Sequence, residues 1–194
     1  KAKEEARAKV RQEREAAAKA EAEEKARAEA RAEARREREK EREAAAKAEG
    51  LWNKHLNGDA FTDELKSQAI NIIRSEMGKI DLVVYSLAAP RRKDPVTGEV
   101  YSSVLKPIGQ AYTAKNLNTS KREIESVSVE PANDDEIFNT VKVMGGEDWE
   151  RWLDQLHAAG VLAENCQTVA YTYIGKELTW PIYGKATIGR AKED

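Results

Sequence analysis

The chain is poor in cysteine and has no long apolar run. Cys166 is the only cysteine among the 194 residues, so an intrachain disulfide is excluded and a reducing compartment, the cytoplasm, is the expected location. The longest apolar stretch, near residues 82–90, is far too short to span a bilayer. With 33 basic and 35 acidic residues, the chain lacks the excess positive charge that attracts nucleic acid or an anionic membrane surface. We therefore expect neither a nucleic-acid partner nor a membrane partner.

The first fifty residues lack the side chains that build a hydrophobic core. They contain 17 alanines, 16 Lys or Arg and 14 Glu, and Val10 is their only large aliphatic residue. The octapeptide REAAAKAE occurs at 14–21 and again at 42–49, and each copy places Glu four residues before Lys, a spacing that stabilises an isolated helix. A coiled coil would require large apolar residues through several heptads. We predict that residues 1–50 form a solvated helix, about 75 Å long, that ends at Gly50 and acts as a spacer.

The globular part of the protein is predicted to lie in residues 51–194. This segment carries all four Trp, all six Tyr and both Phe. Residues 51–57 read as a strand, Thr62 as the cap of a helix, and 80–90 as an apolar strand buried on both faces, which together make one βαβ unit. The remaining elements expected from the pattern are a hairpin at 100–109, helices at 133–141 and 146–159, and a buried strand at 168–174. The predicted fold class is α/β, a partial Rossmann-like doubly wound parallel sheet preceded by the long helix.

Small or polar residues follow the predicted parallel strands at their carboxyl ends. In a doubly wound sheet these ends bind ligands, so the residues there are candidates to contact a nucleotide: Asp59, Ala60, Ser86, Leu87 and Ala88. Small residues after strands also simply allow tight turns, and this interpretation explains the pattern equally well. Asp59, Asp63 and Glu64 could be read as a metal cluster, but capping of the following helix requires fewer assumptions, and no metal is expected.

Tyr183 and Lys192 form a second candidate site, nine positions apart. Residues at that spacing face opposite sides of a single α-helix. However, Pro181 and Gly184 favour a loop at Tyr183, with a helix beginning at Thr187 that could bring Lys192 back toward the phenol. An ammonium beside a phenol lowers the phenol's pKa and suits it to donate a proton. The pair alone is a weak motif.

Five stretches of the chain resemble one enzyme family. They are NGDAF at 57–61, IDLVVYSLAAPRR at 80–92, TGEVYSSVLKPIGQ at 97–110, VKVMGGEDWERW at 141–152 and TYIGKELTWPIY at 172–183. Their sequence and order resemble the trans-2-enoyl-CoA reductases, which include the FabV type of enoyl-acyl-carrier-protein reductase, over essentially all of residues 51–194.

The resemblance implies a Rossmann-type enzyme of fatty acid synthesis that uses NADH to reduce the double bond of a 2-enoyl thioester. The substrate would be an enoyl-CoA or an enoyl-acyl-carrier-protein. At the matching positions, Tyr183 is the proton donor of a Tyr-x8-Lys motif, Lys192 binds the nicotinamide ribose, and Tyr173 contacts the substrate near its thioester carbonyl. The implied cofactor contacts are Asp59 and Ala60 near the adenine and Leu87 and Ala88 after the next strand.

The sequence also departs from this family in the region that should bind the cofactor's phosphates. No GxGxxG-like or P-loop pattern is present, and the Ala/Glu/Lys/Arg helix stands where the family has its first strands and Gly-rich turn. One alternative is therefore a catalytically inactive reductase fragment fused to a helical spacer, with a structural role only. Another is a short-chain dehydrogenase acting on an alcohol or ketone, which is disfavoured because the Tyr-x3-Lys spacing of that group is absent.

Overall fold

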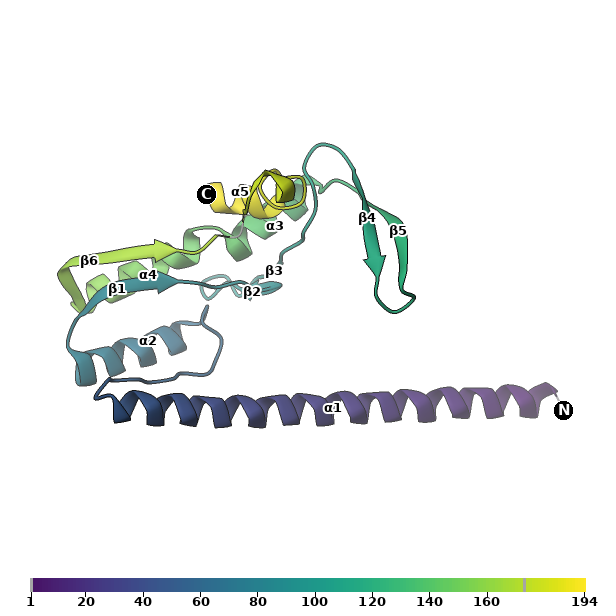
Figure 1. The fold of residues 1–194 in the computed structure, drawn as a ribbon, viewed down its shortest axis with the longest axis horizontal. Helices are drawn as coiled ribbons and strands as arrows, with labels where there is room; N and C mark the ends of the chain where they lie inside the picture. The colour runs from purple at the N-terminus through teal and green to yellow at the C-terminus, as the bar shows by residue number, and fades with distance from the viewer. Residues whose placement is uncertain (1, 173) are drawn as a thin grey trace. The chain divides into compact units, whose positions relative to one another are not determined.

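The protein divides into two compact units, Lys1–Asn57 and Gly58–Asp194. The structure, a computed structural model, describes residues 2–172 and 174–194, with side chains from residue 18 onward. The first unit contains one uninterrupted helix, α1 (Ala2–Ala48), shown in Figure 1. Its ion pair between Arg35 Nε and Glu39 Oε1, at 3.0 Å, has the helix spacing of four residues. Gly50 has a φ of 72°, the left-handed conformation that ends many helices. The predicted long helix ending near Gly50 is confirmed.

The second unit is a mixture of short helices and strands. Its elements in chain order are α2 (Asp63–Ile72), the π-helical turn η1 (Ile73–Met77), β1 (Ile80–Tyr85), β2 (Arg91–Lys93), β3 (Val100–Ser102), β4 (Tyr112–Asn118), β5 (Glu123–Val129), α3 (Asp134–Met144), α4 (Glu147–Ala158), β6 (Leu162–Ala170), the 3-10 turn η2 (Glu177–Thr179) and α5 (Thr187–Glu193). The predicted cap is confirmed at Thr62, whose hydroxyl accepts a hydrogen bond from Leu65 N at 3.3 Å.

Strands β1 and β6 lie side by side and form a parallel pair (Figure 1). Val83 pairs with Thr168 and Tyr85 with Ala170, and Tyr171 N then donates to Tyr85 O at 2.9 Å. A parallel pair is therefore present, as the fold class predicted, but the predicted βαβ unit of residues 51–57 with 80–90 is not, because the partner of β1 is β6. The predicted doubly wound sheet is seen only in this part, because the described residues form three separate two-stranded sheets: β1 with β6, β2 with β3, and β4 with β5.

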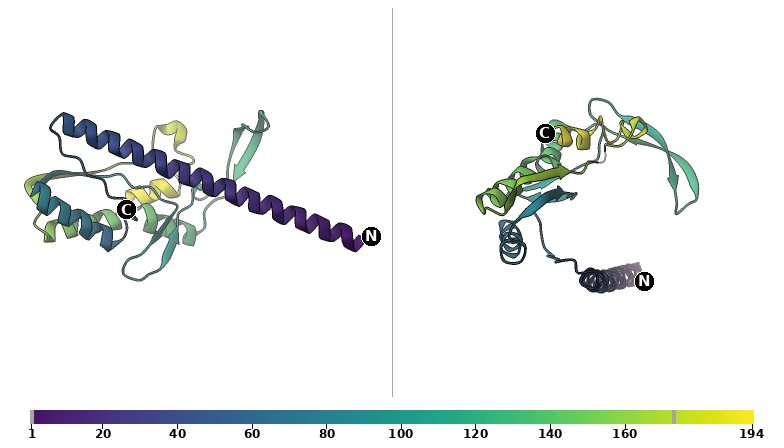
Figure 2. Two further views of the ribbon diagram at one scale, coloured as in Figure 1. Left: turned by 90° about the horizontal axis from the view of Figure 1, so that it is seen from below. Right: turned by 60° about the vertical axis from the view of Figure 1, so that its left-hand side comes forward.

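Two predicted strand features are wrong in detail. Residues 51–57 form no strand; their apolar residues Leu51, Trp52 and Leu56 do not alternate, so they give no one-sided apolar face to pair. The expected hairpin at 100–109 is replaced by pairing of β3 with β2. A further antiparallel hairpin, which the sequence did not predict, is formed by β4 and β5 and extends as a separate two-stranded ribbon (Figure 2).

Two groups of buried apolar side chains hold this unit together. One consists of Tyr101, Val143, Met144, Ile188 and Ala191, and joins β3, α3 and α5. The other consists of Ile70, Leu156 and Val161, and joins α2 to α4 beside the parallel strands. The helices at 133–141 and 146–159 are confirmed as α3 and α4. The buried strand predicted at 168–174 is wrong in bounds and in burial, because β6 runs from Leu162 to Ala170 and all of its residues are half-buried or exposed.

Candidate active site

Helix α5 is fixed in place by its first residue, Thr187. The buried Thr187 hydroxyl donates to Val104 O, and Thr187 N donates to Lys106 O at 3.0 Å. The same extended segment is tied to α3, because Val104 N donates to Thr140 Oγ1 at 3.0 Å. These bonds set the direction of α5 and therefore the place of Lys192 near its other end.

Tyr183 lies in the loop that precedes α5, as predicted. Tyr183 N donates to Thr179 O at 2.9 Å, and Tyr183 O accepts from Ala186 N at 3.3 Å and from Gly189 N at 2.8 Å. The helix begins at Thr187, also as predicted. The loop is thus hydrogen-bonded to the helix that carries Lys192.

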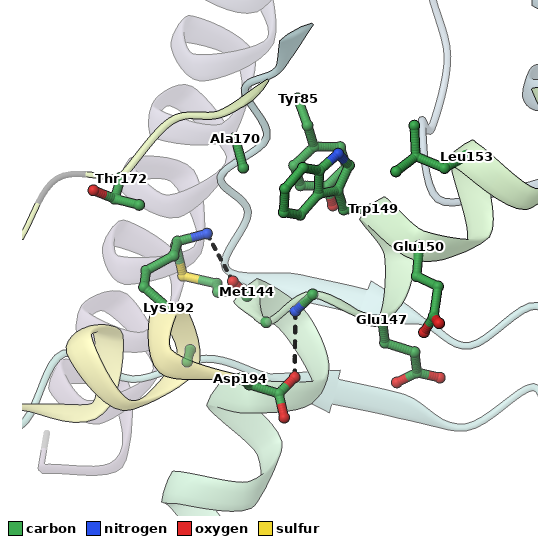
Figure 3. Close-up of a pocket in the computed structure, with 13 residues that line it drawn as sticks. Tyr85, Met144, Glu147, Trp149, Glu150, Leu153, Ala170, Thr172, Lys192 and Asp194 are labelled. Atoms are coloured by element: carbon green, nitrogen blue, oxygen red, sulfur yellow. Dashed lines mark hydrogen bonds between the residues drawn. The ribbon is translucent and has the colours of Figure 1, made fainter. Parts of the chain in front are cut away.

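Lys192 lines a cavity of about 690 Å³ between α4, α5 and the carboxyl ends of β1 and β6 (Figure 3). Its Nζ donates to Met144 O at 2.7 Å, and its burial lowers the pKa of the ammonium below 10.5. On another wall of the cavity, the rings of Tyr85 and Trp149 stack with centroids 6.3 Å apart.

Tyr183 lines a different hollow, of about 550 Å³. Its other lining residues are Ala88, Ala89, Pro90, Ser103, Met144, Gly175 and Thr179. Met144 lines this hollow and the Lys192 cavity, so the two spaces adjoin at that side chain. Lys192 does not bend back to the phenol as the sequence suggested, because its ammonium is directed to the Met144 carbonyl.

Ala60 and Leu87 share a third, mostly apolar hollow of about 350 Å³. Tyr85 lines this hollow and also the Lys192 cavity. The hollow of Ala60 with Leu87 therefore adjoins the Lys192 cavity at Tyr85, and that cavity adjoins the hollow of Ala88 with Tyr183 at Met144, so the three lie in a row. Such a row offers an extended ligand separate places for its two ends.

Two predicted site residues stand apart from this row. Asp59 lines a hollow of about 410 Å³ with Asp63, Asp94 and other residues, and its Oδ1 accepts a hydrogen bond from Phe61 N at 3.0 Å. The Asp59 side chain thus stabilises the turn before α2 through this hydrogen bond, in line with the capping interpretation. Tyr173 lies outside the described residues; the preceding Thr172 lines the Lys192 cavity.

Sequence reasoning missed a buried ion pair beneath Ala60. Lys66 Nζ lies 2.8 Å from Asp148 Oδ1 and also donates to Ala60 O and Phe61 O, at 3.1 and 2.9 Å. Tyr85 Oη donates to the second Asp148 oxygen at 3.1 Å. The available signal was the position of Lys66, one turn before Ile70 on the inward stripe of α2. The pair fixes the backbone at Ala60 and the phenol of Tyr85, which line the first hollow of the row.

Two other kinds of site are absent from the described residues. No group of three or more His, Cys, Asp or Glu side chains among them is placed to hold a metal ion. None of their helices is both long and apolar enough to cross a bilayer.

Asp94, which lines the same hollow as Asp59, makes folding stability depend on pH. Hydrogen bonds from Thr97 N and Val96 N, at 3.0 and 2.7 Å, hold the pKa of this buried carboxyl below its ordinary value of 3.8. A lowered pKa stabilises the fold above pH 3.8, and this contribution is lost as the pH falls through the folded-state pKa.

We expect Asp94→Asn, whose amide oxygen preserves the two turn hydrogen bonds, to unfold at lower urea concentration than the wild type at neutral pH. In acid the Asp94 carboxylate of the wild type is protonated and its stabilising effect is lost. The urea midpoints of the wild type and the variant should therefore converge below pH 3.8. Urea unfolding at a series of pH values measures this. A midpoint difference that stays constant into acid would contradict it.

Comparisons with known proteins agree on one family. A family model described as the trans-2-enoyl-CoA reductase catalytic region matches residues 38–194. The enoyl-[acyl-carrier-protein] reductase [NADH] of Pseudoalteromonas translucida is 67% identical over 150 residues, which are 77% of this chain and 38% of the relative. The protein of the same name from Colwellia psychrerythraea is 69% identical over 150 residues, again 77% of this chain and 38% of the relative.

Solved structures are similar over the same part of the chain. The trans-2-enoyl-CoA reductase of Treponema denticola, crystallised in complex with NAD, has a TM-score of 0.73 and 53% identity, and covers 78% of this chain and 38% of its own. The Clostridium acetobutulicum enzyme in complex with NADH has a TM-score of 0.73 and 45% identity, with the same coverage. The chain thus spans about 38% of the length of the relatives that it matches.

Proposed function

The chain belongs to the trans-2-enoyl-CoA reductase family, and from this premise we propose that it reduces the C2–C3 double bond of a trans-2-enoyl thioester with NADH. The substrate would be carried by CoA or by an acyl-carrier protein in cytoplasmic fatty acid synthesis, since the relatives are named for both kinds of substrate. The observation that carries the proposal is the placement of Tyr183 and Lys192 in hollows that adjoin at Met144.

In the proposed complex, the row of hollows would receive the two ends of a dinucleotide. Ala60 and Leu87, with an apolar lining, would hold the adenine end, and Asp59 would approach it from the neighbouring turn. Lys192 would hold the nicotinamide ribose, with Ala88 close by in the adjoining hollow. When bound there, NADH would supply the hydride that adds to C3 of the substrate.

Lys192 is suited to bind a ribose hydroxyl. An ammonium has three N–H donors, and within the described part of the chain Met144 O accepts one of them at 2.7 Å. The remaining donors of Lys192 can therefore bind a polar ligand group inside the cavity. Partial burial weakens the competition from water, which strengthens such a bond.

Tyr183 would complete the reduction by proton transfer. Addition of hydride at C3 moves the electron pair of the double bond onto the thioester carbonyl, which becomes an enolate. A phenol hydrogen bond to the enolate oxygen stabilises this charge, and the phenol proton serves the protonation of C2. We assign Tyr173 to the thioester carbonyl of the substrate on the family resemblance.

The proposal is tested by mixing the purified chain with NADH and a short trans-2-enoyl-CoA. Loss of NADH absorbance, matched by formation of the saturated acyl-CoA in mass spectrometry, is the expected result. If the chain neither consumes nor binds NADH, that result favours the inactive fragment with a structural role. NADH consumption with a ketone but not with the enoyl thioester would favour a short-chain dehydrogenase.

Lys192→Met separates cofactor binding from the rest of the site. Methionine keeps an unbranched apolar side chain but removes the ammonium, so we expect the Kd for NADH to rise roughly tenfold or more, as for a lost charged hydrogen bond. Fluorescence titration with NADH measures the Kd. The matched control is Lys185→Met, because Lys185 is exposed and lies over the Trp180 ring, 5.5 Å from its centroid. Equal affinities of the two variants would contradict the assignment of Lys192.

A further inference from the structure

Helix α5 lies directly against the backbone of the preceding loop at Gly189. Gly189 N donates to Tyr183 O at 2.8 Å. A Cβ atom added at Gly189 would overlap with the carbonyl oxygen of Gly184 and would lie 2.8 Å from the Tyr183 oxygen. Both oxygens belong to the backbone, so they cannot rotate away as the end of a flexible side chain can. Any side chain at position 189 therefore forces the helix and the loop apart.

Two segments meet at this contact, and helix α5 is held more firmly than the Tyr183 loop. Thr187 is tied to Val104 and Lys106 by hydrogen bonds, and Ile188 and Ala191 are buried in the core cluster that includes Met144. The end of the Tyr183 loop pairs with Pro107 at Ala186, but within the described residues the hydrogen bonds of the Tyr183 backbone reach only Thr179, Ala186 and Gly189, which lie in the loop itself or in α5. A clash at position 189 is therefore relieved by movement of the loop, and Tyr183 moves with it.

We infer that Gly189 is a positioning residue, which fixes the Tyr183 phenol relative to the Lys192 ammonium by letting α5 pack directly on the loop carbonyls. Gly189 touches neither substrate nor cofactor in this assignment and acts through Tyr183. The catalytic meaning of the inference rests on the proposed function, whereas the structural coupling does not. Geometry matters here because a displacement of about 1 Å in a reacting group costs on the order of 100-fold in rate.

The test compares the wild type, Gly189→Ala and a control, Arg190→Ala, in the full chain. Arg190 is the next residue of the same helix, and its side chain is exposed. The first readout is amide hydrogen exchange by NMR, in which we expect the Gly189 amide of the wild type to be protected at least tenfold. The second is the ring signal of isotopically labelled Tyr183, compared with that of Tyr112 on the hairpin.

In Gly189→Ala we expect exchange at position 189 to accelerate at least tenfold and the Tyr183 signal to shift, while the Tyr112 signal and the protection of Ala191 are retained. Arg190→Ala should leave all of these unchanged. The inference is overturned if Gly189→Ala keeps both readouts of the wild type, or if the wild-type amide is unprotected. Should Gly189→Ala fail to fold, the wild-type exchange decides alone, with protection supporting the inference and rapid exchange overturning it.

The kinetic readout separates this inference from the proposed function. If the wild type reduces enoyl-CoA, Gly189→Ala should lose about 10-fold to 100-fold in kcat with little change in the Kd for NADH. An unchanged kcat would overturn the positioning role. If the wild type shows no turnover, the proposed function fails, and the exchange and Tyr183 readouts still decide whether Gly189 fixes the loop.

Discussion

Asp148→Ala is expected to lower the free energy of unfolding by about 3–5 kcal/mol, because it leaves the Lys66 ammonium charged and buried without its counterion. The Lys66 and Asp148 side chains are 0% and 2% exposed. The ammonium would keep only the carbonyls of Ala60 and Phe61 and its position over the Trp152 ring, 5.2 Å from the centroid. Urea unfolding followed by circular dichroism measures the change.

Two further variants show whether the loss comes from the ion pair. Asp154→Ala removes an exposed carboxylate from the same helix, α4, and should change the free energy of unfolding by less than about 0.5 kcal/mol. The double variant Lys66→Met with Asp148→Leu removes both charges, so it should recover much of the loss, as apolar replacements of buried pairs do. A loss in Asp148→Ala no larger than that in Asp154→Ala would contradict the assigned role.

The same pair shows where sequence reasoning reached its limit. The start of α2 was predictable at Thr62, because hydroxyl capping followed by acidic first-turn residues is a local signal. The partner of Lys66 was not, since Asp148 lies 82 positions further along the chain and its acidic place in the first turn of α4 has a local explanation of its own. Contacts between residues that are distant in sequence depend on packing that a single sequence does not display.

Among the strands, too, some were predictable from the sequence and others were not. Residues 80–85 were identifiable as a strand from their mostly apolar sequence, and this is β1. The predicted burial on both faces is wrong, because Leu82 and Val84 are 54% and 47% exposed, and within the described residues β1 belongs to a sheet of two strands that leaves these side chains uncovered.

The apolar residues of β4 and β5 do not alternate regularly along either strand, and polar side chains also pair across the hairpin, such as Thr113 Oγ1 with Ser128 Oγ at 2.9 Å. Its turn contains Arg122 at a φ of 57°, where glycine or asparagine would have been the usual signal. Without that signal the hairpin was overlooked.

Local features of the candidate site were predictable, but its arrangement was not. The loop position of Tyr183 followed from Pro181 and Gly184, and the start of α5 at Thr187 followed from its capacity to begin a helix. The direction of Lys192 did not follow, because it depends on the Met144 carbonyl at the end of α3. The close approach of Gly189 to the loop carbonyls was likewise not predictable, because the sequence does not indicate which backbone atoms a glycine contacts.

Tyr183→Phe is expected to remove most of the reductase activity. Phenylalanine keeps the ring that lines the hollow with Ala88 and Met144 but has no hydroxyl to stabilise the enolate or to supply its proton. Loss of a general acid typically costs about 100-fold to 10,000-fold in rate, so kcat should fall by roughly this factor while NADH binding is retained. Steady-state consumption of NADH with an enoyl-CoA substrate, together with an NADH titration, measures both quantities.

The matched control for this substitution is Tyr112→Phe, because Tyr112 lies on the β4 and β5 hairpin, away from the row of hollows. It loses the same hydroxyl and should keep the kcat of the wild type. If Tyr183→Phe also keeps that kcat, then the phenol is not the proton donor, and the proton must reach C2 from another group or from water. If both activity and NADH binding are lost with the fold intact, Tyr183 serves cofactor binding instead, because removal of a proton donor alone leaves the affinity for NADH unchanged.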